Sequence, residues 1–278
     1  MLRYLKLYRL DAGLLAFLSY VVGSVIAHDL AVGDVFIALG VSLVSMNFVY
    51  SFNSWSDWKI DRINKPARPI ASGRISPRSA LIYSLALLAL ALIYPLFVYR
   101  SWFTLLLFLL LPVLGLLYSV EPIRLKKNLA TGVLTTSLIL IIPIVLGFSM
   151  SSSDTGNAMF FVGLFAFCLS VVPLKDIEDV AGDACGGCDN WLQKLGRRRL
   201  LLFSAIGLGA DGILAYVVAM DPLLRACLLA FIGSALALVG LFSLVPRRIG
   251  RLYRTIILVV IAEGAAAFLL LRLDIGPL

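Results

Sequence analysis

Two short acidic segments carry most of the side chains that could perform chemistry. In each segment three oxygen-bearing side chains recur at helical spacing: Asn53, Asp57 and Asp61 at i, i+4 and i+8, and Asp176, Asp179 and Asp183 at i, i+3 and i+7. Side chains at these spacings share one face of a helix. Opposed carboxylates repel unless a cation lies between them, and carboxylate and amide oxygens suit a hard cation such as Mg²⁺, which usually shares its coordination with substrate phosphates. The segments therefore predict metal ions that bind a diphosphate or a nucleotide.

Basic residues near the acidic segments could bind the same phosphate group. Arginine and lysine form charge-assisted hydrogen bonds to phosphate oxygens. The candidates are Lys59, Arg62, Arg68, Arg124, Lys126, Lys127 and Lys175. A single basic loop with a few carboxylates most often only orients a membrane protein. Two such clusters with matching helical spacing favour a binding site.

The remainder of the chain has the composition of a membrane protein. Of its 278 residues 61% are hydrophobic and 14% are charged, the mean hydropathy is +0.99 and the net charge is +8. A soluble domain is about 45–50% apolar and about 25% charged. The composition excludes a disordered chain, a collagen, a disulfide scaffold and an ordinary cytosolic enzyme. We expect an all-α polytopic membrane protein in which residues 1–278 form one transmembrane domain.

Nine apolar runs are long enough to cross a bilayer core, which requires about 20 residues per helix. They cover residues 12–28, 33–56, 78–99, 101–119, 129–149, 158–174, 199–219, 222–245 and 253–272. The acidic segments are four spans apart and therefore lie on the same side of the membrane. This spacing suggests two repeats of four helices followed by a ninth helix.

The basic residues predict the orientation of the nine-span bundle. On one side of the membrane the loops hold only Arg100, Arg225 and Arg272. The other 21 of the 24 lysine and arginine residues, among them Arg3, Lys6 and Arg9 near the N-terminus, lie on the opposite side. Cytoplasmic loops of membrane proteins carry the excess of lysine and arginine. We therefore expect a multi-pass protein of the cell membrane whose N-terminus and acidic segments are cytoplasmic.

Three stretches of the sequence resemble the UbiA family of intramembrane prenyltransferases. The run from Asn53 to Gly73 is similar to the first motif of that family, and the run from Lys175 to Asp183, followed by Gly187, is similar to the second. The segment Tyr118-Ser119, followed by Pro122, Arg124, Leu125 and Lys126, resembles the stretch after the fourth helix of the family. Together with the nine-helix layout, the resemblance covers nearly the whole chain.

The resemblance implies a site with two Mg²⁺ ions and a prenyl diphosphate. The implied metal ligands are Asn53, Asp57, Asp176 and Asp179. The implied catalytic carboxylates are Asp57, Asp61, Asp179 and Asp183, of which Asp61 and Asp183 act either as further ligands or as partners of loop cations. The implied contacts of the diphosphate are Arg62, Arg68, Tyr118, Ser119, Arg124, Lys126, Lys127 and Lys175.

A resemblance to this family also implies a reaction. Metal ions and basic side chains stabilise the leaving diphosphate, the allylic C–O bond ionises, and a lipophilic acceptor attacks the carbocation. An apolar cavity among the helices protects the cation from water and holds the isoprenoid tail. The expected partners are an isoprenyl diphosphate, a lipophilic acceptor and the lipid bilayer, and no nucleic acid.

Three positions depart from the family pattern. Ser54 replaces the aspartate that most members carry after the first asparagine, which removes one possible ligand. Asn47 stands where members that act on hydroxybenzoate usually carry arginine, which disfavours recognition of a benzoate carboxylate. After Asp183 the loop contains Cys185-Gly186-Gly187-Cys188 in place of the usual sequence.

The CxxC pair formed by Cys185 and Cys188 has no second pair to complete a metal site. The remaining cysteines, Cys168 and Cys227, lie within predicted spans. Structural zinc sites use four ligands. The sequence alone therefore favours neither a zinc site nor a redox role for the pair.

The sequence leaves the acceptor and the class of protein open. Our main expectation is a prenyltransferase that acts on an aromatic quinone precursor. The first alternative is geranylgeranyl transfer to a glycerol phosphate precursor of ether lipids, a reaction of relatives that the Lys175 to Asp179 run resembles. The second alternative is a transporter in which Asp211 and Glu263, acids within spans, form an ion path. Transporters concentrate such groups at mid-membrane, whereas most polar candidates here lie at one face.

Overall fold

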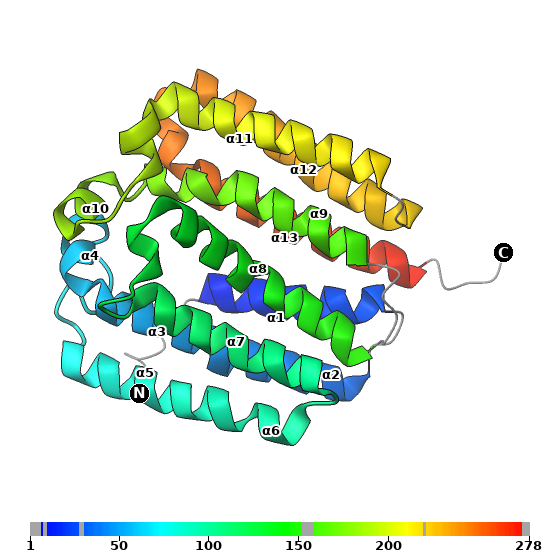
Figure 1. Ribbon diagram of the computed structural model, residues 1–278, viewed down its shortest axis with the longest axis horizontal. Helices are drawn as coiled ribbons and strands as arrows, with labels where there is room; N and C mark the ends of the chain where they lie inside the picture. The colour runs from blue at the N-terminus through cyan, green and yellow to red at the C-terminus, as the bar shows by residue number, and fades with distance from the viewer. Residues whose placement is uncertain (1–6, 8–9, 28–30, 152–157, 219–220, 274–278) are drawn as a thin grey trace.

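The computed structural model describes residues 7, 10–27, 31–151, 158–218 and 221–273, which form helices and connecting turns with no strand among them (Figure 1). The long helices are α1 (Leu10–Ile26), α2 (Val32–Gly40) continued through a π-helical segment (Val41–Met46) into α3 (Asn47–Ser56), α5 (Pro77–Ile93), α7 (Trp102–Ser119), α8 (Leu129–Ser151), α9 (Ala158–Val171), α11 (Trp191–Val217), α12 (Pro222–Leu244) and α13 (Leu252–Leu273). The short elements are α4 (Trp58–Asn64), α6 (Pro95–Val98), α10 (Val180–Gly186) and the 3₁₀ segments η3 (Leu125–Lys127), η4 (Val172–Ile177) and η5 (Pro246–Arg251). The predicted all-α class is confirmed.

Seven helical stretches in the described part of the chain are long and apolar enough to cross a membrane. They are Val32–Ser56, Pro77–Val98, Trp102–Ser119, Leu129–Met150, Ala158–Ile177, Trp191–Val217 and Pro222–Leu244. These stretches indicate a multi-pass membrane protein.

The predicted count of nine spans and the predicted four-helix repeat are not confirmed. The apolar part of α1 is short, from Ala12 to Ile26, and α13 carries Arg254, Glu263 and Arg272 along its length. The orientation in the membrane stays a prediction, and the basic residues Arg3, Lys6 and Arg9 that support it lie outside the described residues.

Helices α1 and α8 are in direct backbone contact at the centre of the bundle. A Cβ atom at Gly23 would collide with the carbonyl oxygen of Ile144, and one at Gly147 would collide with that of Tyr20. The Ser24 hydroxyl donates a hydrogen bond of 3.2 Å to the carbonyl oxygen of Gly147. Small residues permit such close approach of helices in a membrane. The two glycines therefore set the distance between α1 and α8.

Replacing Gly147 by leucine should prevent this contact and unfold the bundle. Overpacking a core costs about 1–3 kcal/mol, and here the new side chain would meet backbone atoms that cannot repack. We expect Gly147→Leu to abolish the monodisperse protein peak in detergent and lower the melting temperature. Gly209→Leu, at an exposed helical position with no atom within 4 Å of the added Cβ, is the matched control. Equal melting temperatures for the two variants would contradict the proposed role of the contact.

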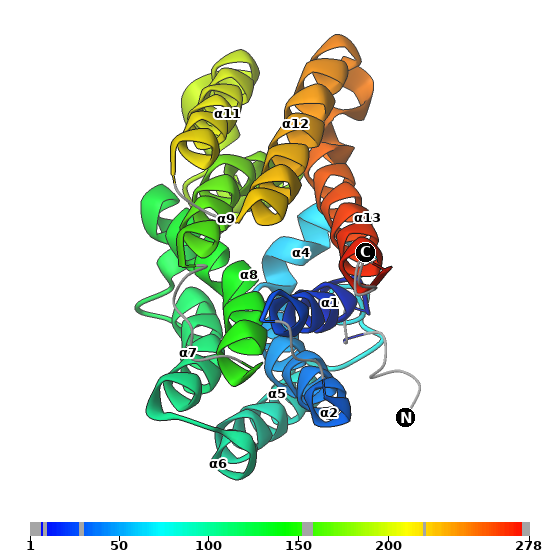
Figure 2. The ribbon, with the colours of Figure 1, turned by 90° about the vertical axis from the view of Figure 1, so that its right-hand side faces the viewer.

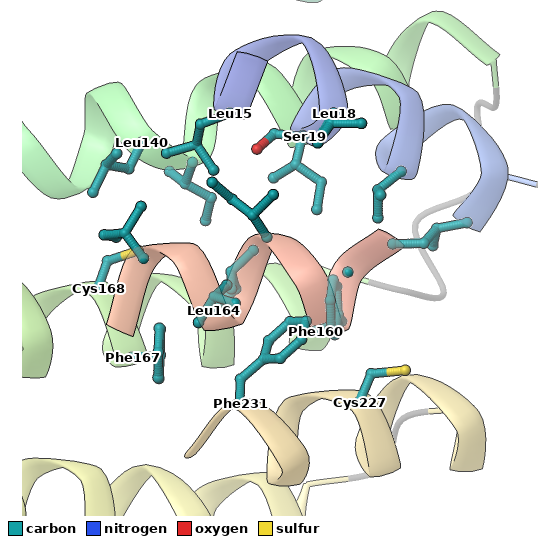
Figure 3. A pocket seen from close by; sticks show the side chains of 18 of the residues that line it. Leu15, Leu18, Ser19, Leu140, Phe160, Leu164, Phe167, Cys168, Cys227 and Phe231 are labelled. Atoms are coloured by element: carbon teal, nitrogen blue, oxygen red, sulfur yellow. The ribbon is translucent and has the colours of Figure 1, made fainter. Parts of the chain in front are cut away.

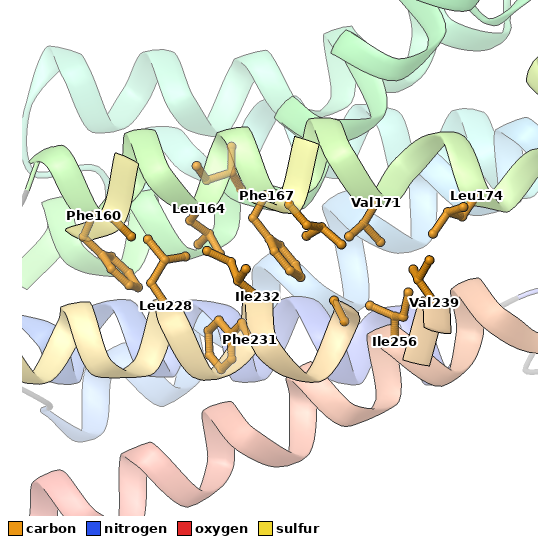
Figure 4. Close-up of a cluster of buried hydrophobic side chains, with 14 of the residues drawn as sticks. Phe160, Leu164, Phe167, Val171, Leu174, Leu228, Phe231, Ile232, Val239 and Ile256 are labelled. Carbon is orange, nitrogen blue, oxygen red and sulfur yellow. The ribbon is translucent and has the colours of Figure 1, made fainter. Parts of the chain in front are cut away.

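Two clusters of buried apolar side chains meet along α1 and α8. One cluster consists of side chains from α9, α11, α12 and α13 with contributions from α1 and α8, and the other of side chains from α1 to α3, α5, α7 and α8. Figure 2 shows the two groups of helices on either side of α1 and α8. In Figure 4, Phe160, Leu164 and Phe167 of α9 face Leu228 and Ile232 of α12. This packing fixes α9, which leads directly into the second acidic segment.

The two acidic segments lie side by side at one end of the bundle, where α4 and α10 pack together (Figure 1). The Asn64 side chain joins them, because its Nδ2 donates to the Asp179 carbonyl oxygen at 2.8 Å and its Oδ1 accepts from the Gly182 N–H at 2.7 Å. A side chain at position 182 would occupy the space of the Asn64 amide. Gly182 thus allows the two short helices to touch.

Neither acidic segment forms the single regular helix that the spacing predicts. Asp57 (φ −99°, ψ 5°) separates α3 from α4, and Asp179 (φ −111°, ψ 7°) separates η4 from α10. The hydrogen bonds from the Asp57 N–H to the Asn53 carbonyl and from the Asp61 N–H to the Asp57 carbonyl are nevertheless kept, at 2.9 and 2.8 Å. The change of direction arises because α4 and α10 turn away from the bundle to pack on each other.

Candidate active site

The first acidic segment faces the loop that follows α7. Asp57 Oδ1 lies 2.9 Å from Arg124 Nη2 and also contacts Lys126 Nζ. Asn53 Oδ1 accepts hydrogen bonds of 3.2 Å from both Lys126 Nζ and Ser119 Oγ. The structure thus brings together five of the predicted site residues, with the Lys126 ammonium between an amide oxygen and a carboxylate oxygen.

Asp61 and Arg68 form a separate ion pair within the first acidic segment. The Asp61 side chain is buried, and its Oδ2 lies 2.6 Å from Arg68 Nη1. Burial raises the pKa of Asp61, and the Arg68 guanidinium offsets part of this rise. In this structure Asp61 is therefore paired with a loop cation, and its assignment as a catalytic carboxylate stays a prediction.

The second acidic segment supplies its carboxylates from η4, the η4–α10 junction and α10. Asp179 Oδ1 lies 2.5 Å from Lys65 Nζ. Asp176, at 8% exposure, accepts a hydrogen bond of 3.0 Å from the Trp191 N–H. Asp183 Oδ2 accepts from Asn190 Nδ2 at 2.9 Å. All three carboxylates thus have a partner within the protein.

Burial raises the pKa of Asp183 to about 6, and the hydrogen bond from Asn190 offsets part of this rise. A raised folded-state pKa means that the protonated form of Asp183 is favoured by folding. The stabilising contribution is complete below the unfolded pKa and is lost as the pH rises through about 6. At neutral pH the Asp183 carboxylate is therefore charged at a cost in stability, as is common for groups at binding sites.

Lys175 lies in η4 with its ammonium group among hydroxyl groups. Its Nζ donates to Tyr118 Oη at 2.8 Å and to Thr136 Oγ1 at 3.1 Å, and it lies 5.3 Å from the centre of the Tyr118 ring. Lys126 Nζ lies 5.8 Å from the same ring. Within the described part of the chain no carboxylate lies within ion-pair distance of Lys175. A cation held this way in a membrane span favours an anionic ligand.

Two of the basic residues predicted to contact a phosphate group lie against other side chains in this structure. The guanidinium of Arg62 is exposed and stacks on the Trp58 ring at 4.5 Å. Lys127 Nζ lies 2.9 Å from Glu121 Oε1, and both side chains are at least 40% exposed. Neither cation reaches an aspartate of the acidic segments. Their assignment as contacts of a diphosphate stays a prediction.

Several residues of the site were not identified from the sequence. Lys65 pairs with Asp179, Thr136 holds Lys175, and Asn190 donates to both the Asp183 side chain and the Asp176 carbonyl oxygen. Lys65 continues the i+4 spacing of Asp57 and Asp61, so helical periodicity could have revealed it. Thr136 and Asn190 had no comparable signal, because their contacts depend on how α8 and α11 pack.

The donor atoms of the acidic segments fit a hard divalent cation. Lys126 already contacts two of the predicted ligand oxygens, from Asn53 and Asp57, and Lys65 contacts a third, from Asp179. Positive groups therefore occupy the positions where the sequence predicts cations. Among the described residues no three histidine, cysteine, aspartate or glutamate side chains converge on one point. Any metal ion here would complete its coordination with ligand or water oxygens, as Mg²⁺ usually does.

An apolar cavity lies among α1, α8, α9, α12 and α13 (Figure 3). Its walls include Leu15, Leu140, Phe160, Cys168 and Phe231. Cys168 lies about two helical turns from the second acidic segment, and Phe160 lies near the opposite end of α9. The cavity therefore extends along α9, the helix that leads into the charged site.

The two acids considered for an ion path are each satisfied by one hydroxyl group. Asp211 of α11 accepts a hydrogen bond of 2.8 Å from Ser170 of α9, and Glu263 of α13 accepts one of 3.2 Å from Ser234 of α12. A buried polar group with a hydrogen-bond partner is the ordinary arrangement in a folded protein. These contacts give no support to the transporter alternative.

A charged site at one end of a helical membrane bundle and an apolar cavity along α9, the helix that leads into that site, agree with the architecture that the resemblance implied. The sequence model of the UbiA prenyltransferase family matches residues 12–269, and this chain belongs to that family. The predicted family membership is confirmed.

Individual relatives support the same conclusion. A digeranylgeranylglyceryl phosphate synthase of Methanosphaera stadtmanae is 32% identical over 188 residues, which cover 65% of this chain and 64% of that protein. A 2-acylphloroglucinol 4-prenyltransferase of Humulus lupulus is 33% identical over 190 residues, which cover 64% of this chain and 44% of that protein. The matches thus span less than two thirds of either relative's own length.

A solved structure shows the same fold. It is that of a UbiA homologue from Archaeoglobus fulgidus bound to GPP and Mg²⁺, with a TM-score of 0.73 and 21% identity. The superposition covers 96% of this chain and 99% of that chain. The helical arrangement is therefore that of the family over almost its whole length.

Proposed function

We propose that this chain transfers a geranylgeranyl group from its diphosphate to a glycerol phosphate precursor of ether lipids. The observation that carries the proposal is that α9 lines an apolar cavity and continues, through η4, into a cation-rich acidic site. A prenyl diphosphate has a charged head and a long apolar tail. The site suits the head, and the cavity suits the tail.

The head of the donor would be bound by metal ions and basic side chains. Asn53, Asp57, Asp176 and Asp179 are the proposed ligands of Mg²⁺, which when bound would neutralise the diphosphate and act as a Lewis acid. Lys175 has no carboxylate at ion-pair distance in the described chain, so its positive charge is left for an anion such as the diphosphate. The GPP and Mg²⁺ bound to the Archaeoglobus fulgidus homologue support this assignment.

The remaining basic residues would act through the pairs that they already form. Arg124 and Lys126 hold Asp57, and Arg68 holds Asp61. Each of these cations fixes a carboxylate and could turn toward phosphate oxygens when a metal ion replaces it. Asp183 would stay a partner of Asn190 and orient the end of α10.

The acceptor is proposed to be a glycerol phosphate lipid rather than the quinone precursor of our main sequence expectation. Asn47, which replaces the arginine of hydroxybenzoate-specific members, donates to the Tyr83 hydroxyl at 2.7 Å and offers no cation to a benzoate. The name of the Methanosphaera stadtmanae relative supports the glycerol phosphate acceptor. The Humulus lupulus relative supports an aromatic one but is matched over a smaller part of its length.

The proposal includes the domain organisation of the chain and its orientation in the membrane. We propose that residues 1–278 form one transmembrane domain and that the acidic segments face the cytoplasm, where the excess of basic residues predicts them to lie. The donor and the acceptor are both amphiphiles, so the bilayer would supply them to the cavity while their phosphate groups stay at the membrane surface.

The proposed function is tested by direct assay of the purified protein. Labelled geranyl, farnesyl and geranylgeranyl diphosphates are each combined with Mg²⁺ and with geranylgeranylglyceryl phosphate, 4-hydroxybenzoate or an acylphloroglucinol. We expect product with the glycerol phosphate acceptor and geranylgeranyl diphosphate, and none after the metal is chelated. Faster transfer to an aromatic acceptor would reject the proposed acceptor, and transfer that continues after chelation would reject the metal dependence.

A further inference from the structure

The turn Cys185-Gly186-Gly187-Cys188 closes α10 and carries two cysteines three residues apart. Gly187 adopts a left-handed conformation (φ +64°), and the Cys188 N–H donates to the Asp183 carbonyl oxygen at 3.0 Å. This reversal is the usual end of a helix at glycine. The Cys188 sulfur folds back over the last turn of α10, where it lies 3.9 Å from the Gly186 carbonyl oxygen.

The spacing of the two cysteines suits a disulfide bond. Residues that flank a four-residue reversal have Cα atoms within about 7 Å of each other. Disulfides join cysteines whose Cα atoms are about 4.4–6.8 Å apart. Cys185 is exposed and Cys188 is 9% exposed, so one thiol is accessible to a small reagent and the other is beside it.

The turn also touches both halves of the charged site. Gly186 packs against Ile60 of α4. The residue after Cys188, Asp189, donates from its N–H to the Lys127 carbonyl oxygen at 2.9 Å. The next residue, Asn190, holds the Asp183 carboxylate. Any change in the turn is therefore transmitted to α4, to the loop after α7 and to the second acidic segment.

We propose that Cys185 and Cys188 form a thiol–disulfide site that reacts with low-molecular-weight disulfides and weakens anion binding at the charged site. The Cys185 thiolate attacks one sulfur of the reagent and releases one small thiol. The Cys188 sulfur then attacks the Cys185 sulfur of the mixed disulfide and releases the second small thiol. The protein becomes a disulfide, and the reagent is reduced to two thiols with the protons of the cysteines.

The physical reason for the coupling is the geometry of the bond. A disulfide requires a dihedral angle near 90° about its S–S bond and a Cβ separation of about 3.5–4.5 Å. To adopt this geometry, the Cys188 sulfur would leave the Gly186 carbonyl oxygen and turn toward Cys185. The backbone beside it is held by the hydrogen bonds from the Cys188 N–H to Asp183 and from the Asp189 N–H to Lys127, so any strain from closing the bond would fall on these two contacts. The proposal does not depend on the prenyl donor or on the acceptor.

The test uses the full-length protein in detergent, equilibrated with reduced or oxidised glutathione. Remaining thiols are alkylated under denaturing conditions and located by mass spectrometry. Amide hydrogen exchange and the Mg²⁺-dependent binding of inorganic pyrophosphate are measured on the same samples. We expect oxidation to remove the thiols of Cys185 and Cys188, to accelerate exchange in residues 180–190, and to weaken pyrophosphate binding about tenfold, the scale of losing a residue that supports a ligand. Dithiothreitol should reverse all three effects.

One variant and two native cysteines serve as controls. Cys185→Ser should bind pyrophosphate as the reduced wild type does and should not respond to oxidised glutathione. Cys168 and Cys227 of the wild type, which line the cavity, should keep their thiols in the same mass spectra.

Three results would overturn the proposal: glutathione that stays attached to Cys185, a disulfide that leaves hydrogen exchange unchanged, or inhibition that persists in Cys185→Ser. Reduced wild-type protein that binds no pyrophosphate would instead count against the proposed function, while the mass and exchange measurements would still decide the thiol–disulfide site.

Discussion

Replacing Asp57 or Asp179 by asparagine is expected to weaken the Mg²⁺-dependent binding of a prenyl diphosphate at least about a hundredfold. Loss of residues that merely support metal ligands costs about 10–100-fold, and these are the proposed ligands themselves. Asparagine keeps the size of the side chain and an oxygen that can accept from Arg124 and Lys126 or from Lys65. The measurement is calorimetric titration of geranylgeranyl diphosphate in Mg²⁺ and after chelation.

The control is Asp189→Asn, in the loop that follows α10. Asp189 pairs with the half-exposed Lys194 at 2.9 Å and contacts no aspartate of the acidic segments. The Asp189→Asn variant should bind the diphosphate as tightly as the wild type does. Circular dichroism of all variants shows whether each is folded, because removal of a charge that pairs with buried cations can itself be destabilising. Folded Asp57→Asn or Asp179→Asn protein with wild-type affinity would refute the two-metal proposal.

Replacing Lys175 by methionine is expected to lower kcat about a hundredfold with a smaller change in KM. Methionine fills a similar volume but lacks the ammonium group, which in the wild type is held by Tyr118 and Thr136. As the C–O bond breaks, negative charge accumulates on the diphosphate, and removal of one group that stabilises such charge costs about 10²–10³ in kcat. Steady-state rates with geranylgeranyl diphosphate provide the measurement.

A second substitution distinguishes the effect of the positive charge of Lys175 on kcat from the effect of its shape. Lys175→Arg retains the positive charge and should recover part of the lost kcat, although the planar guanidinium cannot reproduce both hydrogen bonds. Lys194→Met removes an exposed lysine from the same end of the bundle and should leave the kinetics unchanged. If Lys175→Met had the kcat of Lys194→Met, the ammonium group would have no part in the reaction.

The positions of the acids could be predicted from the sequence, but the breaks in the helices could not. Spacings of three and four residues correctly indicated that Asn53 and Asp57 share one environment. The dihedral angles at Asp57 and Asp179 depend on the packing of α4 against α10, which local sequence does not determine. For the same reason Asp61 meets Arg68 rather than the loop after α7.

The basic residues illustrate what periodicity can and cannot provide. Lys65 lies four residues after Asp61 and pairs with Asp179. Arg62 directly follows Asp61, so it lies about 100° from Asp61 around α4, and its guanidinium stacks on Trp58. Lys65 also follows the last residue of α4, where the backbone leaves the helix and its side chain can reach the second acidic segment. The contact between Lys175 and Thr136 joins η4 to α8 and follows from tertiary packing. The cavity likewise depends on which faces of five helices meet, and no local pattern indicates its volume.

Because α1 and α8 touch at Gly23 and Gly147, the two sides of the cavity differ in how easily their helices can move. On that side the two backbones touch, so α1 and α8 keep a fixed distance from each other even where their lining side chains, such as Leu15 and Leu140, change rotamer. On the opposite side the wall consists of side chains such as Phe231 of α12 and Ile257 of α13, which can change rotamer. Ligands that differ in length or branching would therefore be accommodated by movement of α12 and α13, against a fixed surface formed by α1 and α8.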